Sequence, residues 1–590
     1  MTKWRTVLLA LGGAACLALI AAFFWRRHSL SPPLPALIAY ANLPPQFNQA
    51  LTKAHAAVSR AENLDLEAVR RLARLYHANR LFPEARACYA VLAAAPPGLT
   101  ARDHYYLADI ALGESDLASA QTHLKKVIEM EAGYLPARLS LAESLFKSGQ
   151  EDQAEKVYRD VVAMEAEQPE ASLGLARLEL QRGQEDAAVA RLEQALSRHP
   201  NAIPMAALLA KIHERRGNTD RAVALTQLSL QAPAPPVADP WLEALLADCY
   251  DTQRLSLTFE EYFKTGRMDA AVPLLDRLTL LDPTGPITMM FAGVSHAKAL
   301  QHITAVREYY AALKQGGDPE KICPHLVQSL LAIGNLSEAA TVIAGYFDKN
   351  PNSLPLAKAY AEVALRQGDD KLARNLLEKI LQREPYLVPQ NMSLAKIQWA
   401  AGERDAAAIC LQRVAVAAPA DVPSRALLGE YYLGHGESLA AVKILDEARS
   451  HAAPKTPEHD RLTAMLGAAC VQESAARMAA GKLPEAARLV ERAIELLPDK
   501  PDVYGLGANI YVQSKQFSRA AQLLEKLAAL QPDNPTIYLS LGDVLYQGGQ
   551  HDQARLQWRQ ALQHVAASDD ELRNALNERL EGRITSATFQ

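Results

Sequence analysis

Residue types that catalyse reactions or bind cofactors occur throughout this 590-residue chain, but they do not form a recognisable site. The sequence contains no GxxxxGK[ST], no GxGxxG after a strand pattern, no GxSxG and no HExxH. Its fifteen histidines are scattered, and His296 and His302, six residues apart, do not share a helix face as a metal-binding pair would. Acidic pairs such as Asp369 and Asp370 fall at expected turns or helix starts, whereas a glycosidase needs two carboxylates opposed across a cleft. The sequence therefore predicts no enzyme activity, no cofactor and no metal.

Two further groups of residues are interpreted as packing rather than chemistry. His104, Tyr105 and Tyr106 suggest a ligand cage, but paired tyrosines in a helix more often belong to the core. The six cysteines are scattered, and the five outside the apolar N-terminus contain neither CxxC nor CxxCH. They predict small buried apolar groups rather than disulfides, a zinc site or attached haem.

Composition favours an all-helical protein that does not bind nucleic acid. The chain is 49% hydrophobic but only 6% aromatic, and alanine and leucine suit packed helices better than sheets. Its 62 basic and 67 acidic residues give a net charge of −5, so there is no general basic field for a polyanion. A chain of this length requires several domains or an array of repeats.

A regularly spaced alanine marks an internal repeat. Of the thirteen intervals between successive marker alanines, ten are 34 residues, and the others are 35, 49 and 45. The markers are Ala85, Ala120, Ala154, Ala188, Ala222, Ala271, Ala305, Ala339, Ala373, Ala407, Ala441, Ala486, Ala520 and Ala554. Four residues after the marker stands a larger apolar residue in most blocks, and twelve before it a small one. This spacing predicts two amphipathic helices per block that approach closely at the small residues.

The pattern resembles the tetratricopeptide repeat, a 34-residue helix–turn–helix unit, over about residues 66–567. The resemblance implies an all-α, right-handed superhelical solenoid of about fourteen units. Phe259, Val327 and Ser474 depart from the pattern at the small position, and we expect looser packing or a bend of the array there.

In the family that the repeats resemble, the first helix of each unit lines a groove that binds peptides or partner proteins. The residue after the small position would face this groove. The resemblance thus implies a partner-binding set of Arg74, Asp109, Glu143, Arg177, Lys211, Glu260, Glu362, Lys396, Glu430, Asn509 and Asp543. Its mixed charges do not favour a polyanion or polycation, and ordinary solvated charges on a helix face are the alternative interpretation.

Some family members bind the C-terminal carboxylate of chaperones through lysines and asparagines on the first helices. Only Asn509 matches that pattern, because Gly505 stands in place of the lysine and Ser540 in place of the second asparagine. We therefore do not expect chaperone docking.

An apolar segment at the N-terminus predicts a membrane anchor. Residues 6–25 carry no charge and would span about 30 Å as a helix, which matches a bilayer core. The segment ends directly in Arg26 and Arg27 without a signal-peptide cleavage site, so we expect it to be retained. Two basic residues flank each side. Orientation therefore stays open between a periplasm-like location of the soluble part, which we favour, and a cytoplasmic one.

Prolines and two irregular intervals divide the chain. We expect a transmembrane anchor at 1–28, a proline-rich spacer at 29–45, a capping helix at 46–65 and a first repeat array at 66–236. A second array at 237–453 would begin with an inserted helical turn at 242–250, and a third at 454–567 with an elongated helix from Arg461. Residues 568–590 would form a capping helix and tail.

These features predict a membrane-tethered scaffold that binds protein partners and assembles or positions an envelope complex. The first alternative is a cytoplasm-facing regulatory adaptor of a membrane enzyme. The second is an enzyme with an unrecognised site in the insertions at 231–265 or 450–480.

Overall fold

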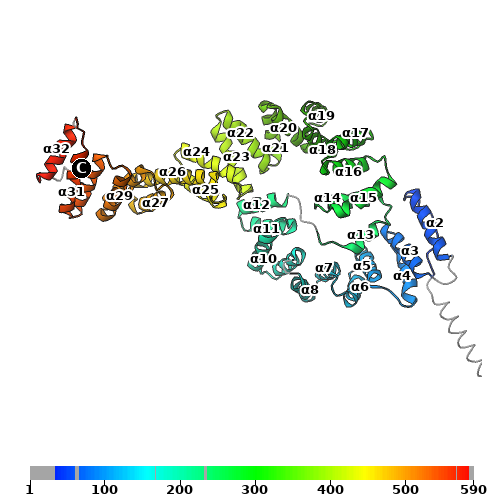
Figure 1. Cartoon of the computed structure of the whole chain (residues 1–590). Helices are drawn as coiled ribbons and strands as arrows, with labels where there is room; N and C mark the ends of the chain where they lie inside the picture. The colour runs from blue at the N-terminus through cyan, green and yellow to red at the C-terminus, as the bar shows by residue number, and fades with distance from the viewer. Residues whose placement is uncertain (1–32, 60–64, 166–167, 231–235, 567, 584–590) are drawn as a thin grey trace, which may run out of the picture. The chain divides into compact units, whose positions relative to one another are not determined.

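The computed structural model describes residues 33–59, 65–165, 168–230, 236–566 and 568–583, and these form thirty-one helices without a strand (Figure 1). None of these helices combines the length and the apolar character that a bilayer-spanning segment needs. The predicted anchor at 1–28 and the tail at 584–590 lie outside the described residues. Contacts divide the chain into two compact units, 1–376 and 377–590, with the division inside one helix, α21.

Twenty-eight helices follow one another as fourteen pairs, here called repeats 1 to 14, which confirms the all-helical expectation. Repeats 1 to 5 are α3 (Leu66–Ala78) with α4 (Phe82–Ala94), α5 (Ala101–Gly113) with α6 (Leu117–Met130), α7 (Leu135–Lys147) with α8 (Glu151–Met164), α9 (Pro169–Gln181) with α10 (Glu185–Arg198), and α11 (Ile203–Arg215) with α12 (Thr219–Ser229). Repeats 6 to 11 are α14 (Thr252–Lys264) with α15 (Met268–Leu281), α16 (Pro286–Lys298) with α17 (His302–Lys314), α18 (Pro319–Ala332) with α19 (Leu336–Lys349), α20 (Leu354–Gln367) with α21 (Asp370–Arg383), α22 (Val388–Ala400) with α23 (Arg404–Ala417), and α24 (Val422–Gly434) with α25 (Ser438–His451). Repeats 12 to 14 are α26 (Pro457–Ala479) with α27 (Leu483–Leu496), α28 (Pro501–Gln513) with α29 (Phe517–Leu530), and α30 (Pro535–Gln547) with α31 (His551–His564).

Three helices stand outside these pairs. They are α2 (Pro45–Ser59), α13 (Pro240–Leu246) and α32 (Asp570–Leu580). The inserted turn expected at 242–250 is thus a seven-residue helix that begins two residues earlier, because Asp239 caps its N-terminus and Pro240 fits the first turn. The elongated helix begins at Pro457 rather than Arg461 for the same reason, with Thr456 as its cap. The three-array division and the right-handed winding stay predictions.

The marker alanines form the seam between the two helices of each repeat. Thirteen of the fourteen are fully buried, and Ala222 is 8% exposed. Four residues on, most of the larger side chains are buried as well, including Tyr158, Tyr309 and Trp558, whereas Leu275 is half-buried. The predicted packing seam is therefore confirmed.

Glycine at the small position lets the helices meet. A Cβ built on Gly542 would lie 2.4 Å from the Trp558 ring, and one on Gly293 would lie 2.7 Å from the Tyr309 ring. The three departures from the pattern, Phe259, Val327 and Ser474, are also fully buried, which speaks against looser packing at these positions, and the expectation of bends stays a prediction. Ser474 satisfies its hydroxyl by donating to the Ala486 carbonyl at 2.9 Å.

The turn inside each repeat contains a residue in the left-handed conformation, always five positions before the marker alanine. In ten repeats this residue is glycine: Gly149, Gly183, Gly217, Gly266, Gly334, Gly368, Gly402, Gly436, Gly481 and Gly549. In the other four it is Arg80, Ser115, Leu300 or Lys515, with φ between 58° and 63°. The left-handed residue reverses the chain between the paired helices, and outside glycine this conformation costs roughly 1–2 kcal/mol.

Within unit 1, the chain after repeat 5 returns to the beginning of the array. A single apolar core contains residues of α2 to α5 together with residues of α13 to α16. Asn79, at the end of α3, joins the two segments: its amide donates to the Asp248 carbonyl at 2.9 Å and accepts from the Tyr250 amide at 2.7 Å. Figure 1 shows α13 beside α3 and α5.

Candidate functional site

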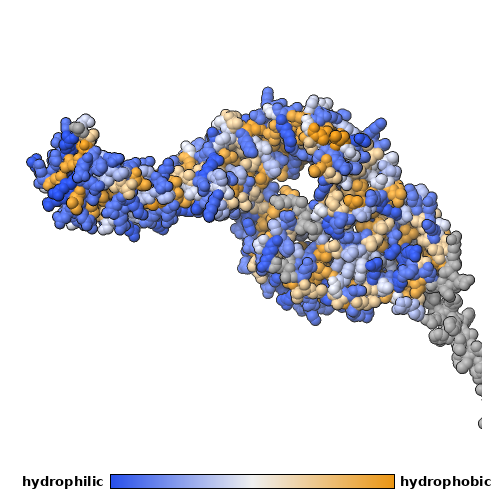
Figure 2. Space-filling model, viewed as in Figure 1, coloured by the Kyte–Doolittle hydropathy of each residue, from blue (hydrophilic) through white to orange (hydrophobic). Residues whose placement is uncertain are grey.

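The eleven residues of the expected partner-binding set all lie on the first helix of their repeat, and none is buried. Lys211, Lys396, Glu430 and Asn509 are exposed, and the others are half-buried. Figure 2 shows hydrophilic residues over most of the visible face of the molecule, with smaller apolar areas among them. These positions are thus available for contacts, and the structure shows what several of them contact within the chain.

Some members of the set join neighbouring repeats. Glu143 lies 3.4 Å from Arg177, which occupies the same position one repeat later, and it also accepts a hydrogen bond from Tyr158 at 3.1 Å. Glu362 accepts from Gln328, the corresponding residue of the preceding repeat, at 2.5 Å. Asp109 lies 2.9 Å from the buried His77 of repeat 1. At these places side chains of the set join one repeat to the next and stabilise their stacking, and both interpretations of the set stay predictions.

Other members pair within their own helix or one repeat along. Glu260 binds Lys264 at 2.6 Å, and Glu362 also binds Arg366 at 3.1 Å, both one helical turn away. Glu430 lies 3.4 Å from Arg461. These pairs are largely exposed, and exposed pairs contribute less than about 1 kcal/mol each, so a partner could replace them at little cost.

At the end of the array, α32 covers the first helix of repeat 14. Arg579 donates to both carboxylate oxygens of Asp543, at 2.7 and 2.9 Å, and the Trp558 ring N–H donates to the same carboxylate at 3.0 Å. Burial raises the pKa of Asp543, and the bonds from Arg579 and Trp558 oppose that rise. Asp543 is therefore occupied by the C-terminal helix rather than open to a partner.

A pocket of about 410 Å³ lies next to Asn509 in unit 2, on the first helices of repeats 13 and 14. Its lining combines apolar side chains with polar ones, which are mostly neutral amides and hydroxyls. The lining residues are Pro501, Asp502, Gly505, Ala508, Asn509, Val512, Leu524, Leu527, Gln531, Asn534, Thr536, Ile537, Ser540 and Val544. Gly505 keeps the space open, since a Cβ there would lie 3.9 Å from its nearest neighbour, a methyl group of Leu527.

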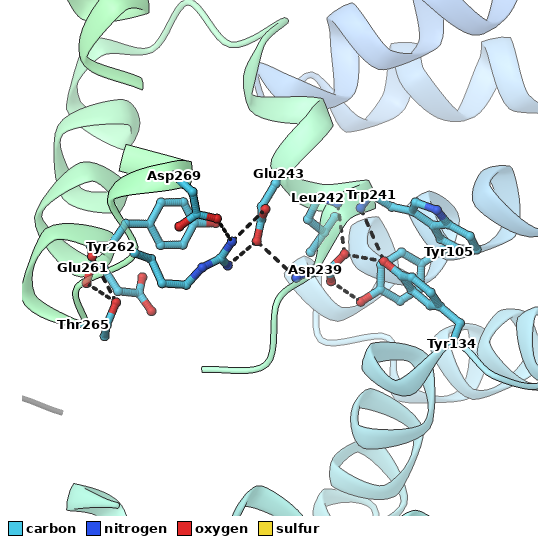
Figure 3. Close-up of polar contacts among 11 residues, drawn as sticks. Tyr105, Tyr134, Asp239, Trp241, Leu242, Glu243, Glu261, Tyr262, Thr265 and Asp269 are labelled. Atoms are coloured by element: carbon cyan, nitrogen blue, oxygen red, sulfur yellow. Dashed lines mark hydrogen bonds and ion pairs between the residues drawn. The ribbon is translucent and has the colours of Figure 1, made fainter. Parts of the chain in front are cut away.

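The first helices of unit 1 bind a segment of the chain itself, formed by residues 237–250. Figure 3 shows the Asp239 carboxylate facing Tyr105 and Tyr134. Tyr105 of α5 donates to one carboxylate oxygen at 2.5 Å, and Tyr134, the residue before α7, donates to the other at 2.6 Å. The first of these tyrosines belongs to the pair that suggested a ligand cage, so the interpretation as simple core packing was incomplete.

Trp241 occupies the space beside the same tyrosines. Its ring stacks on Tyr134, with centroids 3.8 Å apart and planes at 15°, and meets the edge of Tyr105 at 5.6 Å. The Arg102 guanidinium lies 5.6 Å from the indole centroid. The Trp241 carbonyl accepts from the Tyr106 hydroxyl at 2.8 Å. An acidic and an aromatic side chain, two positions apart, are thus held together by one receptor surface.

The tyrosine hydroxyls act as hydrogen-bond donors in this site. Burial raises the pKa of Tyr105, and the charge of Asp239 raises it further. Burial and the hydrogen bond to Asp239 raise the pKa of Tyr134. Because both hydroxyls stay protonated, a carboxylate with two acceptor oxygens satisfies both at once.

The rest of the segment is fixed more firmly. Leu245 and Leu246 are buried, and Arg267, beside α15, binds the Glu243 carboxylate through two nitrogens, one of them at 3.2 Å. Arg74, the member of the partner-binding set in repeat 1, pairs with Asp248 at 3.3 Å. The predicted face of repeat 1 therefore does bind another segment, and that segment belongs to the same chain.

The histidines do not form a metal centre in the part of the chain that the structure describes, where no three His, Cys, Asp or Glu side chains gather as ligands. His296 instead contacts Gln301 at 2.9 Å. His104 faces His123 of α6 with their Nδ1 atoms 3.0 Å apart.

One sequence signal marks this segment. Asp239, Pro240 and Trp241 combine a helix cap, a first-turn proline and a large aromatic residue within a proline-rich break. A tryptophan in a linker requires burial against something. Its receptor, more than 100 residues earlier, could not be identified from that pattern.

Comparisons with known proteins agree with the repeat geometry. Family models described as tetratricopeptide repeat match residues 111–178, 152–212, 477–529 and 506–571. No curated protein sequence matches the chain.

Several solved structures share local similarity. A crystal structure of the APC/C hetero-tetramer Cut9–Hcn1 is 14% identical, with 81% of this chain and 96% of that chain covered and a TM-score of 0.24. A tetratricopeptide repeat protein from Parabacteroides merdae is 16% identical, with 45% and 98% covered and a TM-score of 0.23. A crystal structure of MamA is 21% identical, with 29% and 94% covered and a TM-score of 0.22.

The matched segments lie in repeats 2 to 5 and 12 to 14, and the same alanine seam and left-handed turn continue through the repeats between them. Repeats of this kind bind protein partners. The chain therefore carries tetratricopeptide repeats, which the family models match over residues 111–212 and 477–571.

Proposed function

We propose that the protein is a membrane-tethered scaffold that binds protein partners and assembles or positions an envelope complex. The observation that carries the binding role is the pocket beside Gly505 and Asn509, which is open on the first helices of repeats 13 and 14. Its apolar lining residues suit a side chain of the partner, and its amides and hydroxyls suit the backbone of an extended peptide. The uncharged stretch at residues 6–25 supports the tether.

Filling the pocket tests the binding role. In the Gly505→Leu variant the new side chain enters open space, and leucine in place of glycine favours the helix, so the fold is retained. Gly345→Leu is the matched control, because Gly345 also lies in a helix and nothing lies within 4 Å of its Cβ position. We expect a partner recovered from detergent-solubilised membranes with the wild type and the Gly345→Leu control to be lost with Gly505→Leu. Recovery of no stoichiometric partner with the wild type, or equal recovery with both variants, would contradict the proposal.

The tether is tested separately. Deleting residues 1–28 should move the protein from the membrane fraction to the supernatant after high-speed centrifugation. If the shortened chain still sediments with membranes after a high-salt wash, the anchor lies elsewhere.

The second candidate is a cytoplasm-facing adaptor of a membrane enzyme, which the Arg26–Arg27 pair after the apolar stretch favours. An alkaline phosphatase fused to the C-terminus folds into an active enzyme only after export. Activity supports the envelope-facing scaffold, whereas an inactive but intact fusion supports the adaptor.

A further inference from the structure

The side chains of Asp239 and Trp241 contact residues of the first array. Tyr105 and Arg102 lie on α5, and Tyr134 directly precedes α7. Together they contact both side chains that the segment presents, the Asp239 carboxylate and the Trp241 ring. This is a complete recognition site for a short peptide, with a polar and an aromatic contact point.

The occupant of this site is only partly fixed. Asp239 and Trp241 are half-buried, and Pro240 between them is exposed. The firm attachment begins later, with the buried Leu245, Leu246 and Cys249. The first part of the segment can therefore leave the tyrosines while the second part stays in the core.

The chemistry of the site selects its ligand. Two hydroxyl donors, one to each oxygen, match a carboxylate, whereas an amide would offer them one acceptor oxygen and a competing donor. Stacking on Tyr134, an edge contact with Tyr105 and the nearby Arg102 cation favour an electron-rich aromatic ring two residues later.

We propose that Tyr105, Tyr134 and Arg102 form a binding site for an extended peptide with the pattern Asp-x-Trp, and that residues 237–242 occupy this site as an internal competitor. A partner protein that presents the same acidic and aromatic side chains binds by displacing the internal copy. The internal segment then occupies the site in the free protein, and only a partner at high local concentration displaces it. The site lies in unit 1 and the pocket beside Gly505 lies in unit 2, so the two proposals succeed or fail separately.

Displacement is tested with a fluorescent peptide of the sequence PVADPWLEALL, residues 236–246, and the full-length protein. The wild-type chain competes with its own tethered copy, and tethering raises the effective concentration to about the millimolar range. The double variant Asp239→Ala, Trp241→Ala frees the site. We expect this variant to bind the peptide at least about tenfold more tightly than the wild type does in fluorescence anisotropy.

Two controls assign the binding to the proposed contacts. A peptide with alanine at both positions should not bind, and one with Asn in place of Asp should bind more weakly. Adding Tyr105→Phe and Tyr134→Phe to the double variant keeps the rings but removes the hydroxyls, and should weaken binding at least about tenfold. Equal binding to wild type and double variant would place the peptide elsewhere and overturn the proposal.

Because the double variant also loses the Asp239 helix cap, a second measurement uses the wild-type protein alone. Excess peptide should speed hydrogen exchange at the amides of Trp241 and Leu242, which the Tyr134 hydroxyl and the Asp239 carboxylate hold in the closed state. Unchanged hydrogen exchange at millimolar peptide would show that the segment is a permanent part of the fold and not a competitor. The same conclusion would follow if a double variant with a native circular dichroism spectrum did not bind the peptide.

Discussion

At the scale of the residue, the marker alanines are the positions where the packing of the helices most restricts the size of the side chain. Ala520 is fully buried between α28 and α29, with Leu524 filling the space one turn later. Replacing Ala520 with leucine should force the helices apart and lower the free energy of unfolding by about 1–3 kcal/mol. The Ala529→Leu control adds the same side chain at an exposed position of α29. Denaturant unfolding of both variants measures the difference, and equal midpoints would show that the seam lies elsewhere.

The histidine pair of repeat 2 should make stability depend on pH. Burial lowers the pKa of His104. Burial also lowers the pKa of His123, and the nearby charges of His104 and Arg86 lower it further by smaller amounts. Nearby charges act on His104 in both directions, with Asp103 and Glu129 raising its pKa and Lys126 lowering it. In the unfolded chain both histidines have a pKa of about 6.5. The folded state therefore binds fewer protons than the unfolded state near this pH, and stability is lost as the pH falls below that value.

Removing the titrating groups tests this assignment. From pH 7.5 to pH 5.5, the wild-type melting temperature should fall further than that of the double variant His104→Gln, His123→Gln. Burial also lowers the pKa of His55, His213 and His325, but these are present in both proteins and cancel in the comparison. Parallel falls in the two proteins would assign the pH dependence to those other histidines.

The sequence predicted the residues of the seam well, because small and large apolar types repeat at fixed spacing and burial follows from type. It predicted the contacts of polar residues poorly. Arg74 and Asp543 were expected to face a partner, yet Asp248 and Arg579 of the same chain occupy them. The charged partner of a long side chain depends on how elements that are distant in sequence pack together. A local sequence pattern does not predict this packing.

At the scale of the element, the left-handed residue of the turn gives each helix pair its sharp reversal. Leu300 is the least suited of the fourteen, because it combines φ of 62° with a side chain that is 81% exposed. Leu300→Gly should therefore raise the free energy of unfolding by about 1 kcal/mol, since the strain is removed and no packing is lost.

The converse change is the matched control. At Gly402, φ is 81° and nothing lies within 4 Å of a Cβ, so Gly402→Ala introduces the strain alone and should destabilise by about 1 kcal/mol. Thermal melts of the two variants should move in opposite directions from the wild type. A shift of both in the same direction would mean that the turn conformation is not what limits stability.

Helix existence and pairing could be predicted, whereas helix docking could not. The spacing of the apolar residues located the fourteen pairs. The short helix α13 was expected as an extra turn, but its place against α3, α5 and α7 depends on Tyr105, Tyr106 and Tyr134, which lie over 100 residues earlier. Contacts at that separation follow from the curvature of the repeats between them, which the sequence pattern does not specify.

At the scale of the whole molecule, the two units are stabilised in different ways. In unit 2 each repeat contacts its neighbours in sequence. The stability of unit 2 is therefore approximately the sum of the stabilities of its repeats and of the interfaces between neighbouring repeats. In unit 1 one core contains both the first repeat and the sixth, so these two should unfold together. A destabilising change at the contact between them should therefore act on both, although the intervening repeats separate them along the chain.

Asn79 lies at that contact and tests the coupling. Its side chain is 7% exposed and satisfies the Asp248 carbonyl and the Tyr250 amide. Asn79→Ala leaves both backbone groups without their partner and should cost about 2–3 kcal/mol. Hydrogen exchange should then become faster in α3 and in α14 alike, while α28 to α31 keep their wild-type rates.

The matched control is Asn509→Ala. Asn509 is exposed, and its amide oxygen accepts a hydrogen bond from Gln513 of its own helix, so this variant should change hydrogen exchange in neither unit measurably. Faster exchange in α3 with α14 unchanged would show that the first and sixth repeats share a surface but do not fold as one.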